Sequence, residues 1–215
     1  MSSKNQDERL SPAIDLMYSH IGQPNTAVRT YLPLSWFSEA GQVGLQRFWN
    51  DALEQFPLQS GYVGYSLFYN NNFDSLIEPH IFAWLQRHPG LLEPMFSHSI
   101  VSQHGLVDLG WITLLGKGFV DRMGGAESLK EAVSHIGGVH CLDLPHQGLG
   151  IQLGDHPRMG DLAKGDAMDD YRALGKVLAP LRNRQALHEG MSVAGFDDNE
   201  YPGLREKWID RFFPE

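Results

Sequence analysis

Segments with strand-like and helix-like patterns alternate along most of this chain, and glycine or proline residues separate many of them. The clearest signal lies at residues 139–153, where two apolar runs, VHCLDL and LGIQL, flank the turn sequence PHQG. Two such runs around a short turn are typical of a β-hairpin, whose strands pair antiparallel. The fold therefore has to contain at least one antiparallel strand pair.

Three other runs are rich in β-branched, aromatic and other apolar residues and predict strands. They are residues 27–34 (AVRTYLPL), 61–69 (GYVGYSLFY) and 106–115 (LVDLGWITLL).

Helices are predicted where apolar residues recur at helical spacing. Residues 41–56 form one such segment, which Pro57 ends. A shorter helix opens at Glu78-Pro79, carries Trp84 on its apolar face and stops at HPG, and further helical segments cover 119–135. Together with the strands, these segments predict an α+β fold in which mixed or antiparallel sheets pack against helices.

We expect residues 1–26 to form an N-terminal segment and residues 27–215 to form a single α+β domain. Within that domain, residues 27–90 and 106–184 each combine an apolar strand, a short helix, a glycine break and a longer helix, which suggests two similar halves. Apolar residues in 202–213 fall on one helical face, so this segment is predicted to close the fold as a helix.

The stretch GDHPRMGDLAKGDAMDDYRAL, at residues 154–174, contains three Gly-Asp steps and then a pair of aspartates. The apolar residues from Ala167 to Leu181 follow one helical stripe, with Asp166 at the predicted N-cap. Asp169 and Asp170 then lie in the first turn, where the helix dipole favours negative charge. Turns and a capped helix explain the stretch better than a calcium loop or a phosphate cradle, whose ligand spacings it lacks.

A metal-dependent hydrolase remains an alternative, because His140, His146, Asp155 and Asp161 supply ligand types that transition metals accept. Their spacing matches no known metal motif, and neighbouring side chains on a strand, such as His140 and Cys141, point to opposite faces. The chain also lacks nucleophile-elbow, dinucleotide and Walker sequences. We therefore predict that the protein is not an enzyme and holds no metal or cofactor.

Composition narrows the class of partner. With 17 Lys and Arg against 26 Asp and Glu, the formal charge is −9, which repels nucleic acid and attracts basic proteins. A single cysteine and the lack of an apolar leader or bilayer-length run fit a cytoplasmic protein.

Five motifs occur in a characteristic order: LPLSWFSEAG, SGYVGYSLF, EPHIFAWLQRHPGL, LGWITLLG and GDHPRMGDLAKGDAMDDYRAL. Together, over about residues 31–181, they resemble the bacterial type VI secretion immunity family that guards against VRR-type nuclease effectors. The resemblance implies a non-enzymatic cytoplasmic antidote that binds a cognate, restriction-endonuclease-like toxin and blocks its DNA cleavage. A non-enzymatic adaptor for another partner would need the same kind of binding face and stays open.

A nuclease presents a cationic groove to DNA, so an acidic inhibitor is electrostatically complementary to it. Partner specificity is expected on loops such as 70–74, 93–104 and 197–201. The candidate partner-binding residues are Asp74, Glu78, Glu93, Asp155, Asp161, Asp169, Asp170, Asp197, Asp198, Glu200 and Tyr201.

Overall fold

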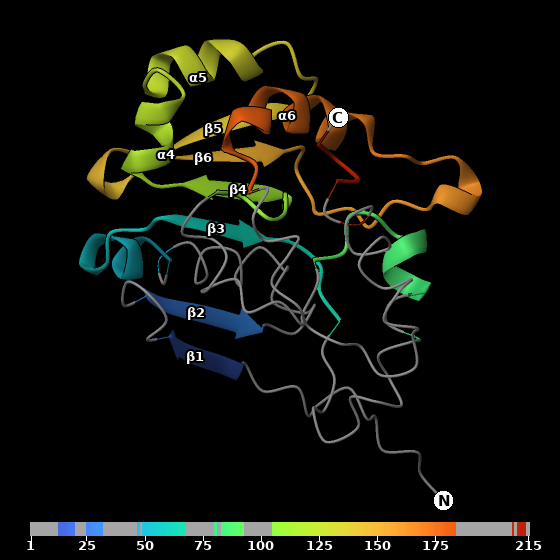
Figure 1. Ribbon diagram of the computed structural model, residues 1–215, viewed down its shortest axis with the longest axis horizontal. Helices are drawn as coiled ribbons and strands as arrows, with labels where there is room; N and C mark the ends of the chain where they lie inside the picture. The colour runs from blue at the N-terminus through green and yellow to red at the C-terminus, as the bar shows by residue number, and fades with distance from the viewer. Residues whose placement is uncertain are drawn as a thin grey trace, which may run out of the picture.

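The computed structural model describes residues 13–19, 25–31, 47, 49–67, 80, 83–92, 105–183, 208 and 210–213 (Figure 1). These residues form an α+β fold, as predicted. Its sheets are antiparallel throughout the described part of the chain.

The larger sheet has four strands in the order β3-β4-β6-β5. Their bounds are β3 (Ser60–Val63), β4 (Ile112–Leu115), β5 (Val139–Leu144) and β6 (Gly148–Leu153). The predicted hairpin is confirmed, because β5 and β6 pair with Val139 opposite Leu153 and Leu144 opposite Gly148. The turn between them is the 3-10 helix η4 (Pro145–Gln147).

A second sheet consists of β1 (Ala13–Ser19) and β2 (Asn25–Tyr31), with Ala13 opposite Tyr31. Figure 1 draws this hairpin beyond β3, on the side of the larger sheet away from β5. The sequence patterns missed β1, which lies inside the segment assigned to the N-terminus, and placed β2 about two residues too late.

Helices gather around β5 and β6 (Figure 1). They are α4 (Lys117–Arg122), α5 (Ala126–Val133) and α6 (Asp169–Leu178), with the 3-10 turns η5 (Leu162–Lys164) and η6 (Ala179–Leu181) on either side of α6. Residues 49–55 are helical and end before Pro57, and residues 83–87 are helical and end before the HPG sequence, as predicted.

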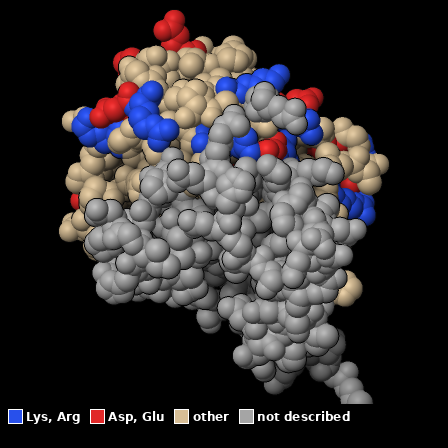
Figure 2. Space-filling model, viewed as in Figure 1, with Lys and Arg blue, Asp and Glu red and all other residues tan. Residues whose placement is uncertain are grey.

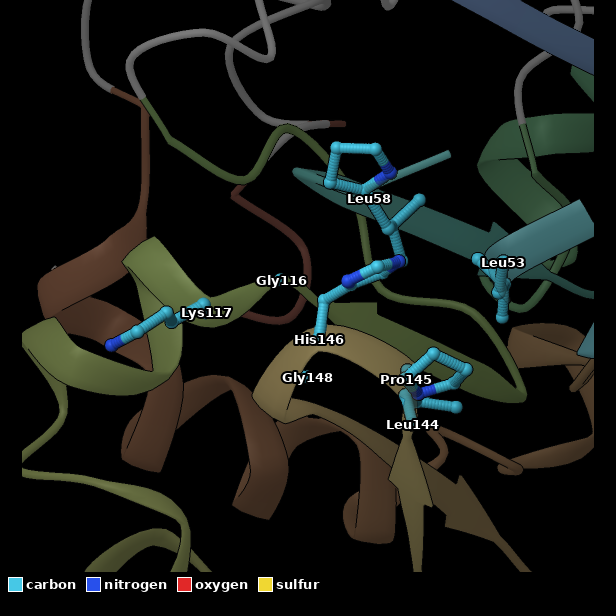
Figure 3. Close-up of a pocket in the computed structure, with 9 residues that line it drawn as sticks. Leu53, Leu58, Gly116, Lys117, Leu144, Pro145, His146 and Gly148 are labelled. Atoms are coloured by element: carbon cyan, nitrogen blue, oxygen red, sulfur yellow. The ribbon is translucent and has the colours of Figure 1, made fainter. Parts of the chain in front are cut away.

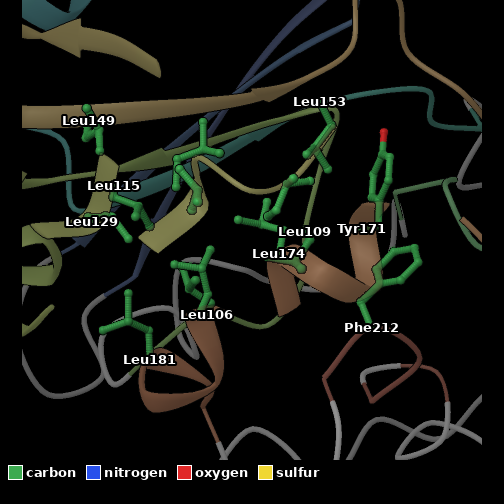
Figure 4. Packing of buried hydrophobic residues seen from close by; sticks show 14 of the residues in the cluster. Leu106, Leu109, Leu115, Leu129, Leu149, Leu153, Tyr171, Leu174, Leu181 and Phe212 are labelled. Carbon is green, nitrogen blue, oxygen red and sulfur yellow. The ribbon is translucent and has the colours of Figure 1, made fainter. Parts of the chain in front are cut away.

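The core lies between these helices and one face of the larger sheet (Figure 4). Alternation along β6 directs Leu149, Ile151 and Leu153 to that face, and each is at most 1% exposed. Tyr171 from α6 packs on Phe212 of the C-terminal segment, with ring centroids 5.2 Å apart. The C-terminal segment therefore docks on the core, although most of the helix predicted at 202–213 lies outside the described residues.

Two strand predictions were too long. Residues 106–111 are buried but form no strand, and β4 begins only at Ile112. The backbone of Leu106 instead bonds to the chain after α6, receiving from Asn183 N at 2.8 Å and donating to Leu181 O at 2.7 Å. β3 likewise ends at Val63, well before the expected position 69.

Candidate partner-binding surface

Several of the predicted partner-binding residues lie outside the described part of the chain and remain predictions. These are Asp74, Glu78, Glu93, Asp197, Asp198, Glu200 and Tyr201, together with the loops at 70–74, 93–104 and 197–201.

Asp161 has a structural role that the sequence did not reveal. Its carboxylate accepts two hydrogen bonds from Arg87, from Nε at 3.0 Å and from Nη2 at 2.9 Å. It also accepts from the backbone N–H of Ala163 at 3.1 Å, which caps η5. The hydrogen bonds from Arg87 lower the pKa of Asp161 to about 2. With its side chain only 14% exposed, Asp161 mainly joins two segments of this protein.

Arg158 forms ion pairs with two further carboxylates. Its guanidinium lies 3.1 Å from Asp166 and 3.1 Å from Asp170. Asp166 was predicted to be the N-cap of α6, and this prediction is wrong. The helix begins at Asp169, and Met168 occupies the N-cap with φ 56°. Asp166 still accepts from the backbone N–H of Met168 at 3.2 Å and so stabilises the turn into the helix.

Asp155 and Asp169 are the predicted candidates that remain exposed within the described residues. Asp155 is 87% exposed at its side chain, and its Oδ1 lies 3.8 Å from His140 Nε2. Asp169 occupies the first turn of α6 together with Asp170, as predicted. Among the predicted partner-binding residues that the structure describes, these two carboxylates are the most accessible to a partner.

The four residues proposed as metal ligands in the hydrolase alternative do not come together at one site. His140 approaches Asp155, whereas Asp161 is held by Arg87 and His146 bonds through Nε2 to the carbonyl of Glu54 at 3.0 Å. Figure 3 shows His146 pointing from the η4 turn toward Leu58, across an apolar pocket of about 150 Å³. Among the described residues, no three His, Cys, Asp or Glu side chains are placed to hold a metal ion.

Cys141 lies on β5, half-buried, on the face opposite to that of His140. Burial raises the pKa of its thiol, which disfavours the reactive thiolate. The two neighbouring side chains thus point to opposite faces of the strand, as predicted.

Acidic and basic residues are mixed over residues 105–183. Residues 105–183 contain 10 Asp and Glu against 8 Lys and Arg, so they account for −2 of the total formal charge of −9. Figure 2 shows blue and red groups interspersed over the described part of the visible face. Most of the acidic excess therefore belongs to residues 1–104 and 184–215.

An exposed apolar surface is the feature that sequence reasoning missed. Trp84 was assigned to the apolar face of its helix, but its neighbour Leu85 is 1% exposed and Trp84 is 53% exposed. Met159 and Leu162 are 40% and 44% exposed. We call these three exposed side chains, together with the Arg87–Asp161 ion pair that joins the two segments carrying them, the Trp84 patch. Helical periodicity alone did not predict it, because adjacent residues 84 and 85 share one broad apolar stripe.

Two segments distant in sequence meet at the Trp84 patch. Besides the Arg87–Asp161 pair, His88 Nδ1 donates to the carbonyl of Gly160 at 2.7 Å, and the Gly90 N–H donates to that of Met159 at 2.8 Å. Trp84 lies one helical turn before Arg87 and His88, on the side that faces the loop. Its ring centroid is 5.3 Å from that of His88. Figure 1 draws the helical segment and η5 next to one another at the edge of the molecule.

Within the described residues, no helix has the length and apolar character needed to cross a membrane. A search of curated proteins finds no match to this chain. A Pseudomonas aeruginosa T6SS protein, PA0821, has a similar solved structure, with a TM-score of 0.71 and 18% sequence identity. The match covers 90% of this chain and 54% of that one, so the chain spans about half the length of the solved structure. At this identity the likeness shows a shared fold.

A family model gives the identification. The model TsiV, described as type VI immunity for VRR-NUC, matches residues 3–212, which confirms the resemblance seen in the ordered motifs. Because the match spans nearly the whole chain, this protein belongs to the TsiV family of type VI immunity proteins for VRR-NUC.

Proposed function

We propose that this protein is an antidote that binds a VRR-type nuclease effector of a type VI secretion system and stops it from cleaving DNA in the producing cell and its sisters. The observation that carries the proposal is the family match over residues 3–212. The antidote acts by binding, without catalysis of its own, in the cytoplasm where the nuclease would reach DNA.

Electrostatics supports this kind of partner. A nuclease must attract a polyanion, so its substrate groove carries positive potential. A protein with a formal charge of −9 is drawn to such a groove and away from DNA itself. The exposed carboxylates Asp155 and Asp169, and the predicted acidic loop at 197–201, would contribute to this attraction.

The test is co-purification of this protein with the VRR-type nuclease encoded next to its gene, followed by a DNA-cleavage assay. Cleavage is expected to fall in proportion to added protein and to stop near one equivalent at micromolar concentration, where a dedicated antidote is saturated. Protein unfolded by heat serves as the control and should not protect DNA. Full cleavage and no complex with the folded protein would reject the proposal.

A further inference from the structure

The Trp84 patch exposes large apolar side chains that the core does not require. Among the described residues, five large hydrophobic side chains are exposed, and three of them, Trp84, Met159 and Leu162, belong to this patch. Single exposed apolar residues are common, but several grouped together mark interaction surfaces. Tryptophan, methionine and arginine are also residue types enriched at protein interfaces.

The patch is held in place before any partner arrives. Three polar contacts join its two segments: the Arg87–Asp161 pair, His88 to Gly160, and Gly90 to Met159. The backbones also approach closely, since a Cβ on Gly90 would lie 2.2 Å from the carbonyl oxygen of Arg158. A surface that is already ordered loses less conformational entropy on binding, so more of its contact energy appears as affinity.

The charge around the patch selects the class of partner. Residues 155–170 contain five aspartates against Arg158 and Lys164, and with Arg87 of the patch the formal charge is −2. Arg87 and Arg158 neutralise the carboxylates nearest the patch, whereas Asp169 stays exposed. An apolar centre with an acidic margin complements a protein whose surface combines apolar residues with excess Lys and Arg, and it repels nucleic acid.

We propose that the Trp84 patch is a contact surface for the nuclease effector, with Trp84 and Leu162 as its apolar anchors and the exposed carboxylate of Asp169 facing cationic residues of the nuclease. This inference rests on the function proposed above and assigns that function to described residues. It adds a surface that differs from the loops predicted from sequence.

The experiment measures binding of the same nuclease, kept inactive in EDTA, to Trp84→Ala, Leu162→Ser and the double variant. Each single substitution is expected to weaken binding about tenfold or more, mainly through faster dissociation. Phe56→Ala is the matched control, because Phe56 is 72% exposed and directly follows the helical segment 49–55, which Figure 1 draws in cyan on the opposite side of the molecule from the helical segment that carries Trp84. Its affinity should stay within about twofold of wild type.

Circular dichroism and the thermal midpoint identify variants that have lost their fold, which is not expected of exposed positions. Folded Trp84 and Leu162 variants that bind like wild type would overturn the assignment of the patch while leaving the antidote function intact. Failure of the wild-type protein to bind the nuclease would overturn both. A free protein that dimerises through Trp84, with the dimer lost in Trp84→Ala, would assign the patch to a second copy of the chain and overturn the nuclease contact.

Discussion

Arg211 reaches Asp108 inside the protein, with 2.5 Å between Arg211 Nη2 and Asp108 Oδ1 and both side chains less than 9% exposed. Arg211 also donates to the backbone carbonyls of Pro89 at 2.7 Å and Trp208 at 2.9 Å. Its guanidinium lies 3.6 Å from the centroid of the Trp208 ring. One side chain thus links the C-terminal segment, the buried segment before β4 and the end of the helix that carries Trp84.

Replacing one member of this pair should strongly destabilise the fold. Asp108→Asn keeps the shape of the side chain but leaves the Arg211 charge buried without its counter-charge, which typically costs about 3–5 kcal/mol of unfolding free energy. Urea unfolding followed by tryptophan fluorescence measures the loss. The matched control is Asp121→Asn in the exposed Lys117–Asp121 pair of α4, which should change stability by less than about 0.5 kcal/mol. Equal effects of the two substitutions would contradict the role given to Arg211.

The Arg87–Asp161 pair predicts a specific dependence on pH. The pKa of Asp161 is lowered from 3.8 to about 2 by hydrogen bonds from Arg87, so the folded state favours the ionised carboxylate. This contribution to stability is present above pH 3.8 and is lost as the pH falls through 2. Arg87→Gln should therefore lower the thermal midpoint at neutral pH, and the difference from wild type should shrink over that acidic range.

Carboxyl titration by NMR tests the same pair directly. In Arg87→Gln, the pKa of Asp161 should rise toward 3.8, while its hydrogen bond from Ala163 keeps it somewhat lower. Arg122→Gln serves as the control, because Arg122 donates to Pro180 and should leave Asp161 unchanged. An unshifted Asp161 in Arg87→Gln would show that Arg87 does not set its ionisation.

Two helical glycines predict opposite effects of an added methyl group. A Cβ on Gly175 in α6 would lie 1.8 Å from the carbonyl oxygen of Phe212, whereas one on Gly118 in α4 would meet nothing within 4 Å. Gly175→Ala should cost about 1–3 kcal/mol through overpacking and displace the C-terminal segment. Gly118→Ala should gain about 0.5–1 kcal/mol from helix propensity. Urea unfolding of both variants, with limited proteolysis at the C-terminus, measures the contrast, and a stabilised Gly175→Ala would show that α6 and Phe212 are not in close contact.

Local sequence patterns predicted the elements whose structure depends on residues adjacent in the chain. The β5–β6 hairpin was predicted because its turn and both apolar runs are contiguous, and the ends of two helices followed from Pro57 and the HPG sequence. Residues 106–111 were misassigned because a buried apolar run has the same pattern whether it is a strand or an irregular segment. Its backbone partners are distant in sequence, since Leu106 pairs with the chain after α6 and Trp111 accepts from Leu153 of β6, and no local pattern specifies them.

The Trp84 patch was hidden from sequence reasoning for a similar reason. Asp161 and Arg87 are 74 positions apart in the sequence. Local sequence patterns could therefore predict neither that Arg87 pairs with the Asp161 carboxylate nor that the two segments dock on each other. Asp161 was predicted to face a partner as one of the acidic residues that could complement a cationic groove. The resemblance to the family, in contrast, rested on the order of five motifs, which carries more information than any single contact, and the family model over residues 3–212 confirmed it.

Steering by exposed carboxylates gives a final prediction about association with the nuclease. Asp155→Lys with Asp169→Lys changes the formal charge from −9 to −5, and Asp197→Lys with Asp198→Lys does the same from a loop outside the described residues. Each double variant should associate more slowly at low ionic strength, because like charges now oppose the cationic nuclease. The difference should nearly vanish in about 1 M salt, where the Debye length is roughly 3 Å. Stopped-flow association rates across a salt series measure this, and the pair with the larger effect lies closer to the contact. A pair whose reversal leaves the low-salt rate unchanged takes no part in steering.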